Sequence, residues 1–304
     1  MNGTDPRMMP PPGGVVFRDV QTAHQPFGWG KAALWVVVVL LAASFLWAIA
    51  NNPNFGWPTI GEYFFHPEVV SGLWTSLGLT VVAMVLGTII GLVLAVMRLS
   101  DDRLANGVAG LYIWFFRGTP LLVQLIFWYN MSTLFPTLGV GIFGLTIGGW
   151  DTNSVITPLT AAILGLALNE AAYMAEIIRG GLLSVDKGQA ETASAFGMTR
   201  ARALRRIVIP QAMRSIVPPT GNQLISMVKA TSLVSVIAMS DLLYAVQSIY
   251  NRTFDIVPML LVAVFWYLII TSVLNVGQGY IERYYGRSDC RNRIIANAQP
   301  AGEV

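Results

Sequence analysis

Three ionisable side chains stand inside strongly apolar stretches of the sequence, at Glu170, Glu176 and Lys229. A charge within an apolar span is costly, so it is first considered as part of a path for a substrate or ion. Counted at about 1.5 Å per residue from the expected outer ends of their spans, Glu170 and Lys229 each lie roughly 18 Å deep, near the midplane. A carboxylate and an ammonium at that depth could bind the two charged groups of a zwitterionic ligand.

Each of these charges also has a purely structural interpretation. Glu170 and Lys229 could neutralise each other inside the helix bundle, which costs less than burying either one alone. Glu176 precedes Arg179 by three residues, and an i,i+3 ion pair at a helix end is the interpretation that we favour for it. Tyr173 precedes Glu176 by three residues and is expected on the same helix face.

The sequence offers little for other kinds of chemistry. Cys290 is the one cysteine, and the two histidines are far apart, so we expect no disulfide, no metal site and no catalytic residue. No Gly-x-x-x-x-Gly-Lys-Ser/Thr phosphate loop is present, and we expect no bound cofactor. Gly139-x-Gly141-x-x-Gly144 matches a dinucleotide fingerprint only in its letters, and we interpret it as a glycine-rich loop.

Composition and apolar runs predict the elements that position the charged residues. The chain is 54% hydrophobic and only 12% charged, against about 25% charged residues in soluble domains. We therefore expect an all-α membrane protein with six transmembrane helices. The predicted spans cover residues 32–50, 70–97, 120–135, 158–178, 216–239 and 257–277. Glycines within the second span should allow close helix packing, at Gly72, Gly78, Gly87 and Gly91.

Local signals suggest how two of the spans begin. Thr119 followed by Pro120 resembles an N-cap and first helical residue, so residues 111–117 are interpreted as an interfacial piece and the third span starts at Pro120. Arg117 then lies at the interface, at a helix start, where it could also help to gate a path. The pair Pro218-Pro219 predicts a bend near the start of the fifth span.

The distribution of basic residues predicts the orientation of the chain. With six spans both termini lie on one side, and the positive-inside rule makes that side the cytoplasm. Arg252 is the one basic residue expected outside. The basic residues expected inside include Arg7, Arg18, Lys31, Arg98, Arg103, Arg179, Lys187, Arg200, Arg202, Arg205, Arg206, Arg214, Arg283, Arg287, Arg291 and Arg293.

A long polar segment, Arg179–Arg214, separates the fourth and fifth spans on the expected cytoplasmic side. Ser184 or Asp186 can cap a first helix, and Gly197 suits the left-handed position that ends it. Thr199 can cap a second helix that ends before Pro210. This helix–turn–helix could be a lid over the bundle or a docking surface for a soluble partner.

The same segment resembles the EAA loop of ABC-importer permeases, Glu-Ala-Ala-x3-Gly-x9-Ile-x-Leu-Pro. The matching positions are Glu191, Ala193, Gly197, Ile207 and Pro210, with Thr192 and Ile209 as mild departures. The resemblance implies a helix that docks into a cleft of a separate ATPase subunit, so that the chain has no ATPase site of its own. The residues implied in this coupling are Gly188, Glu191, Ala193, Gly197, Ile207 and Pro210.

Further stretches resemble the polar amino acid branch of these permeases. They are Phe116–Gln124, Ala172–Gly181, Pro210–Ala212 and Lys229–Leu233, and the resemblance covers about residues 71–279. The branch more often has Asp where Ala230 stands. The implied fold is a type I (MetI-like) permease core of five helices with one extra N-terminal helix. Substrate-path residues expected from charge and resemblance together are Arg117, Glu170, Tyr173, Glu176, Lys229, Thr231 and Ser232.

The expected organisation follows. Residues 1–30 form a disordered cytoplasmic tail, 31–50 an extra transmembrane helix, 71–279 the permease domain with its EAA loop at 179–214, and 280–304 a second cytoplasmic tail. The resemblance implies a bacterial plasma membrane protein that works with ABC ATPase subunits, an extracytoplasmic substrate-binding protein and a second permease copy or related subunit. The alternative is a stand-alone secondary transporter or channel that uses Glu170 as a cation or proton site.

Overall fold

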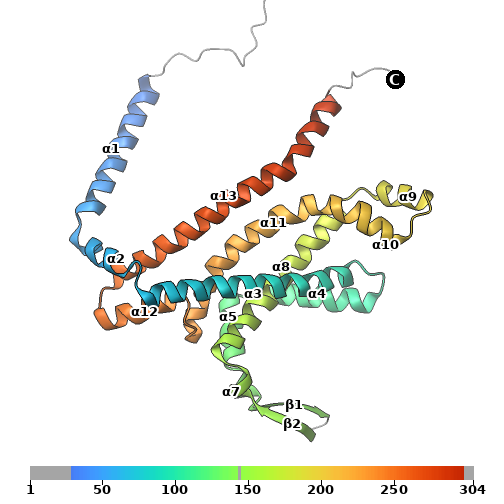
Figure 1. Cartoon of the computed structure of the whole chain (residues 1–304), viewed down its shortest axis with the longest axis horizontal. Coiled ribbons are helices and arrows are strands. Elements are labelled where there is room, and N and C mark those ends of the chain that lie inside the picture. The colour runs from blue at the N-terminus through green and yellow to red at the C-terminus, as the bar shows by residue number, and fades with distance from the viewer. Residues whose placement is uncertain (1–28, 143–144, 298–304) are drawn as a thin grey trace, which may run out of the picture. The chain divides into compact units, whose positions relative to one another are not determined.

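The structure, a computed structural model, describes residues 29–142 and 145–297 (Figure 1). The chain divides into two compact units, Met1–Phe55 and Gly56–Val304. The expected disordered tail over residues 1–30 lies outside the described residues, except for its last two positions. The expected permease domain, 71–279, falls within the second unit.

The described part of the first unit is one long apolar helix followed by a short turn. Helix α1 runs Trp29–Asn51 and η3 runs Pro53–Phe55. The helix carries apolar side chains on all faces, and none of its residues is buried. Such a helix is suited to a lipid environment.

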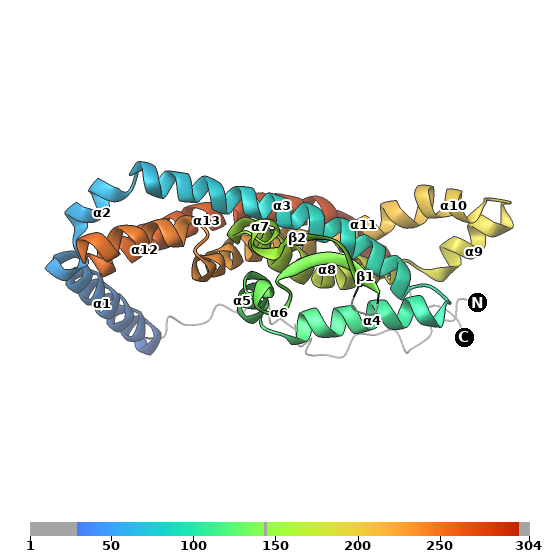
Figure 2. The same cartoon turned by 90° about the horizontal axis from the view of Figure 1, so that it is seen from below.

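The second unit consists of helices and one β-hairpin (Figures 1 and 2). Its elements are, in order, α2 Trp57–Tyr63, α3 Pro67–Arg98, α4 Arg103–Gly118, α5 Leu121–Tyr129, α6 Met131–Leu134, β1 Thr137–Ile142, β2 Leu145–Asp151, α7 Thr152–Val155, α8 Pro158–Leu183, α9 Lys187–Ala195, α10 Arg200–Ala203, η4 Leu204–Val208, α11 Ile209–Ala230, η5 Thr231–Ile237, α12 Leu242–Thr253 and α13 Ile256–Asn297. Helices α9 and α10 lie at one end of this unit, while α2 and α12 lie at the other (Figures 1 and 2).

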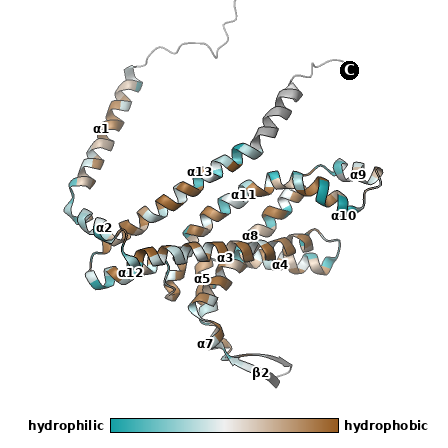
Figure 3. Ribbon diagram, viewed as in Figure 1, coloured by the Kyte–Doolittle hydropathy of each residue, from teal (hydrophilic) through white to brown (hydrophobic). Residues whose placement is uncertain are grey.

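Four of the described helices, α1, α3, α8 and α13, are long and apolar enough to cross a membrane. Two further pairs meet the same criteria if each is taken as one bent span, which brings the number to six. The predicted all-helical class with six spans is compatible with this arrangement. Hydrophobic residues dominate these helices, whereas hydrophilic residues gather on α9 and α10 (Figure 3).

The third span differs from its prediction. Helix α5 has only nine residues, about 14 Å at 1.5 Å per residue, and it reaches membrane length only together with α4. The axes of α4 and α5 differ by 101°. Thr119 does not cap α5, because its hydroxyl donates to the carbonyl of Phe115 and its backbone ends α4. Arg117 accordingly lies in the last turn of α4, not at a helix start.

The fifth span is longer and more irregular than predicted. Pro218 and Pro219 lie inside one helix, α11, which ends at Ala230 and continues as the 3-10 turn η5. Ala238 has a left-handed backbone with φ 56°, after which Asp241 caps α12. Helix α12 replaces the loop that was expected there, and it makes an angle of 46° with the preceding helical segment.

One predicted loop and part of the predicted C-terminal tail have regular secondary structure. The glycine-rich loop 136–157 contains an antiparallel hairpin, in which Thr137 pairs with Asp151 and Ile142 with Leu145. The register shifts between Gly139 and Val140, so that Gly148 has no partner across the ladder. The expected tail after residue 280 is also helical, because α13 continues to Asn297.

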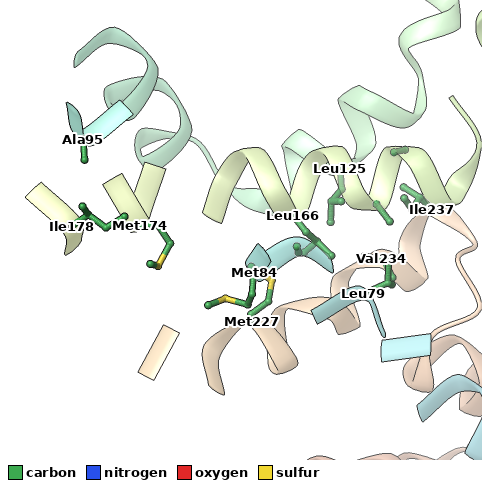
Figure 4. Close-up of a cluster of buried hydrophobic side chains, with 13 residues drawn as sticks. Leu79, Met84, Ala95, Leu125, Leu166, Met174, Ile178, Met227, Val234 and Ile237 are labelled. Carbon is green, nitrogen blue, oxygen red and sulfur yellow. The ribbon is translucent and has the colours of Figure 1, made fainter. Parts of the chain in front are cut away.

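The core of the unit lies where α8 is enclosed by α3, α5, α11 and η5. Buried apolar side chains from these five elements form one cluster (Figure 4). Gly87 and Gly91 allow α3 to approach α8, because a Cβ atom at either position would lie 2.7 Å from a side-chain carbon of α8. Gly72 packs equally closely against the Asp241 carbonyl, whereas Gly78 faces open space. Close packing is therefore confirmed for all but Gly78.

Candidate functional site

Helices α9 and α10 form a helical hairpin, and α9 begins and ends as its sequence predicts. Asp186 caps α9, its Oδ1 accepting from the Gly188 N–H at 2.6 Å. At the other end Gly197 has φ 72°, and Met198 N–H donates to the Ala193 carbonyl while Gly197 N–H donates to Ser194. These two bonds form a Schellman closure, which requires a residue in the left-handed conformation.

The second helix of the hairpin does not end before Pro210. Thr199 caps α10 as predicted, but the chain then widens into the π-helical turn η4 and continues into α11. Ile209 N–H donates to the Leu204 carbonyl, five residues back. Because Pro210 has no N–H and its ring crowds the carbonyl four residues before it, a wider turn at this point relieves a conflict that would otherwise break the helix.

The residues implied in ATPase coupling differ in how exposed their side chains are. Ala193 is buried between the two short helices, Gly188 and Ile207 are half-buried, and Glu191 and Pro210 are exposed. Glu191 lines an open cleft of about 570 Å³ together with Ser194, Arg200, Ala203, Leu204 and Val208. Phe196, at the tip beside Gly197, is 83% exposed. No role was predicted for Phe196, although a large apolar residue at a turn is a recognisable signal.

Glu170 is enclosed near the centre of the bundle. Its side chain is 1% exposed and packs against Gly87 of α3. Gln223 of α11 donates to Glu170 Oε2 at 2.9 Å, while Oε1 has no hydrogen-bond partner among the described residues. Because this oxygen is buried, it can accept a hydrogen bond only from a group that enters the bundle beside it.

Lys229 lies in a different environment. It is exposed and lines a cleft of about 290 Å³ between α11 and α13, together with Ser232, Val264, Tyr267, Leu268 and Thr271. The Thr231 hydroxyl donates to the Val228 carbonyl at 2.8 Å, and the Ser232 hydroxyl donates to the Lys229 carbonyl at 2.7 Å. Both hydroxyls thus help to turn the helix at η5, and they can only accept from a further group.

Glu170 and Lys229 form no ion pair in the part of the chain that the structure describes. Gln223, which contacts Glu170, and Lys229 are six residues apart on α11, which places them about 120° apart around the helix axis. One face of α11 therefore contacts Glu170 through Gln223, and Lys229 lies on another face of the same helix. Mutual neutralisation is therefore absent from this arrangement. Joint binding of a zwitterion by the two charges stays a prediction.

The remaining candidates lie toward the C-terminal end of α8. Arg179 donates to Glu176 through Nε at 3.1 Å and Nη2 at 2.8 Å, which confirms the predicted i,i+3 ion pair. The Arg117 guanidinium carbon lies 5.3 Å from the centre of the Tyr173 ring, a cation–π contact between α4 and α8. Arg117 and Tyr173 are thus brought together, whereas Lys229 and its neighbours are separate.

Sequence reasoning missed the amide side chains that surround these charges. Gln223 is the hydrogen-bond partner of Glu170. Asn169 and Gln124 are both buried and bonded to each other across α8 and α5. The available signal was the presence of strongly polar amides within apolar spans, which rarely occur without a partner.

Comparison with known proteins identifies the family of the chain. Residues 87–286 match the model described as "Binding-protein-dependent transport system inner membrane component". The chain is 42% identical over 291 residues to the arginine transport system permease protein ArgU of Corynebacterium glutamicum, covering 94% of this chain and 90% of that protein. It is 36% identical to the L-cystine transport system permease protein TcyB of Bacillus subtilis, covering 76% and 92% respectively.

Solved structures agree with these relatives. The crystal structure of an amino acid ABC transporter with histidines is 36% identical, with a TM-score of 0.62 over 72% of this chain and 95% of that one. The MetNI methionine ABC transporter shares the fold at 20% identity, with a TM-score of 0.57 over 72% of this chain and 96% of that one. The chain therefore belongs to the family of binding-protein-dependent transport system inner membrane components, as an amino-acid ABC transporter permease.

Proposed function

We propose that this permease moves a polar amino acid through the bundle around Glu170, driven by a separate ATPase that docks on α9 and α10. The observation that carries the proposal is the unbroken helical path from Arg200 through η4 into α11. That path links the docking hairpin directly to Gln223, the hydrogen-bond partner of Glu170. A displacement of the hairpin therefore reaches the substrate path without passing through a loop.

A substrate with a basic side chain is the first to test. The free oxygen of the buried Glu170 carboxylate can accept from a guanidinium or ammonium group, and a charge-assisted hydrogen bond of this kind is among the stronger ones. The ArgU relative, by its name, serves an arginine transport system. The proposed path extends toward the cytoplasm along Arg117, Tyr173 and Glu176. Its proposed second branch contains Lys229, Thr231 and Ser232.

The proposed assembly includes a second permease, either another copy or a related subunit, and a substrate-binding protein outside the cell. A lysine at the centre of a span that faces lipid costs about 2.5–3.5 kcal/mol, so the exposed Lys229 supports a face that is covered in the assembly. We further propose that both termini are cytoplasmic. The one basic residue on the opposite side, Arg252, is paired with Glu68 at 2.6 Å.

Substitution of Gly197 tests the coupling. A side chain in the left-handed conformation costs about 1–2 kcal/mol for most residues, while Asn tolerates it better. We expect Gly197→Val to lose association with the ATPase subunit and ATP-dependent uptake, and Gly197→Asn to retain most of both. No atom lies within 4 Å of a Cβ at this position, so the effect reports backbone conformation and not a clash. The measurements are co-purification with the ATPase and uptake into proteoliposomes that contain the binding protein.

A different outcome separates this proposal from a secondary transporter. If the purified chain alone accumulated the amino acid in response to a proton or sodium gradient, with no ATPase present, the proposed coupling would be wrong. Retention of full ATP-dependent uptake by both Gly197→Val and Glu191→Lys would equally remove α9 and α10 from the coupling path.

A further inference from the structure

The bend between α4 and α5 leaves backbone carbonyl groups without helical donors. Thr119 and Pro120 are extended, with ψ of 142° and 133°, and the two helix axes differ by 101°. Pro120 has no N–H, so the Phe116 carbonyl, four residues earlier, cannot form its usual helical bond. Within a membrane no water is at hand to satisfy such a group, so another donor must take its place.

Two buried amide side chains supply these donors. Asn169 Nδ2 donates to the Phe116 carbonyl at 2.9 Å, and Gln124 Nε2 donates to the same carbonyl at 3.1 Å. Gln124 Nε2 also lies within hydrogen-bond distance of the carbonyl and the hydroxyl of Thr119, at 3.1 and 2.7 Å, so its two N–H groups are shared among three acceptors. Asn169 Nδ2 donates to Gln124 Oε1 at 3.2 Å, so that the two amides are joined. Asn169 is 8% exposed and Gln124 is 5% exposed.

These bonds fasten the bend to the part of α8 that carries the proposed substrate path. Asn169 immediately precedes Glu170 in α8. Arg117, one residue after the shared Phe116 carbonyl, lies over the ring of Tyr173, one turn further along α8. Leu125 of α5 packs into the space left by Gly165, so α5 and α8 are also in close contact there. The bend and this stretch of α8 are therefore joined by hydrogen bonds, a cation–π contact and close packing.

We propose that Asn169 and Gln124 are positioning residues for transport, which keep the bend between α4 and α5 fixed to α8 beside Glu170. This inference rests on the proposed substrate path. With the bend held in place, Glu170 and the Arg117–Tyr173 contact keep a constant geometry on one side of the path. Gln223 approaches Glu170 from α11, the helix that continues to the docking hairpin. The amide pair thus keeps one side of the proposed path, formed by the bend and α8, in place. The ATPase displaces the opposite side, which is formed by α11.

Both amides act as hydrogen-bond donors to backbone carbonyl groups. Substitution by the corresponding acid therefore removes the N–H donors while keeping the size of the side chain. Asn169→Asp retains the size of the side chain but replaces its N–H groups with a carboxyl oxygen facing the Phe116 carbonyl. Gln124→Glu makes the matching change on α5. Tyr112→Phe is the control, because the Tyr112 hydroxyl donates to the Leu168 carbonyl at 2.9 Å, a bond between α4 and α8 that involves neither amide. The substitution keeps the ring that packs against Phe116.

The experiment uses the complete transporter in proteoliposomes, with its ATPase and binding protein, and L-arginine as the probe. Uptake per ATP hydrolysed, the KM for uptake and the thermal midpoint of the complex are measured together. We expect Asn169→Asp and Gln124→Glu to lower uptake per ATP at least tenfold, and Tyr112→Phe to stay within twofold of the wild type. Because uptake per ATP does not depend on the amount of folded complex, a role in stability alone would leave it unchanged.

Several outcomes would overturn the inference. It is wrong if both amide variants transport within twofold of the wild type per ATP, or if uptake and ATP hydrolysis decline in proportion as the thermal midpoint declines. It is also wrong if both variants fail to assemble while Tyr112→Phe assembles, because the amides would then serve folding. Failure of the wild-type complex to show ATP-dependent uptake would instead count against the proposed function.

Discussion

Glu170 is the residue whose contacts divide most clearly between structure and function. One of its carboxylate oxygens accepts from Gln223, and the other has no partner among the described residues. A glutamine at this position fits the same space, and its carbonyl oxygen can still accept from Gln223. Only the negative charge and the free acceptor are lost.

We therefore expect Glu170→Gln to raise the KM for a basic amino acid while the protein stays folded. Loss of a charge-assisted hydrogen bond costs about 1.5–3 kcal/mol, which corresponds to roughly 10- to 100-fold in affinity. The measurement is concentration-dependent uptake of radiolabelled substrate into proteoliposomes. Glu62→Gln, which removes an exposed carboxylate from α2, is the matched control and should leave the KM unchanged. An unchanged KM in Glu170→Gln would exclude Glu170 from the path.

The sequence indicates which residues are unusual but not which of them meet. Glu176 and Arg179 were predicted correctly as a pair, because three residues on a helix fix their geometry. The partner of Glu170 is 53 residues away, and no local periodicity relates the two. Lys229 was considered as that partner because it has a similar predicted depth in the membrane. Depth in the membrane does not say which face of α11 carries the residue.

At the scale of helices, close packing between α3 and α8 depends on glycines at defined positions. Gly91 lies where a Cβ would be 2.7 Å from Met174 Cβ and 2.9 Å from the Ala171 carbonyl. Gly78 lies on the same helix with nothing within 4 Å of its Cβ position. The two positions therefore provide a comparison between a crowded and an open site in one helix.

We expect Gly91→Leu to lower the thermal midpoint of the purified permease clearly and Gly78→Leu to leave it nearly unchanged. Overpacking of a close interface costs about 1–3 kcal/mol, occasionally more. Both substitutions raise helix propensity by a similar amount, so the difference between them isolates the packing. Equal midpoints for the two variants would show that α3 and α8 are not in close contact at Gly91.

Element boundaries were predictable where capping residues mark them. Thr199 caps α10 as expected, and Gly197 ends α9 through its left-handed backbone. Helix α12 was missed because the spans were sought as continuous apolar runs, whereas α12 is amphipathic, with Leu242, Ala245, Val246 and Ile249 on its buried face after the Asp241 cap. The hairpin at Thr137–Asp151 was missed because a glycine-rich segment without an Asn-Gly turn has no strong hairpin signal. The division of the third span depends on donors from α8, which lie far away in sequence.

At the scale of the whole chain, the proposed orientation places α9 and α10 inside the cell and the β-hairpin outside. The chain contains a single cysteine, Cys290, so a cysteine-free background needs only Cys290→Ser. Trp150 in β2 is 70% exposed, and Phe196 at the tip of the α9–α10 hairpin is more exposed still. Each can be replaced by cysteine as a topology reporter.

We expect a membrane-impermeant maleimide to label Trp150→Cys in intact spheroplasts and to label Phe196→Cys only after permeabilisation. The physical reason is the positive-inside bias, which places nearly all basic residues on the side of α9 and α10. Labelling is read as a mass shift of the purified protein. The reverse pattern would place the docking hairpin outside and exclude an intracellular ATPase as its partner.

The π-helical turn Leu204–Val208 contains one residue more than the α-helical turn that it replaces. Removal of one residue there would restore a regular α-helical turn and bring the Pro210 ring against the carbonyl four residues before it. It would also rotate α10 relative to α11 and change the fixed distance between Gly197 and Pro210 that the EAA pattern contains. The number of residues between Gly197 and Pro210 should therefore be constant among related chains, because the wide turn and the proline depend on each other.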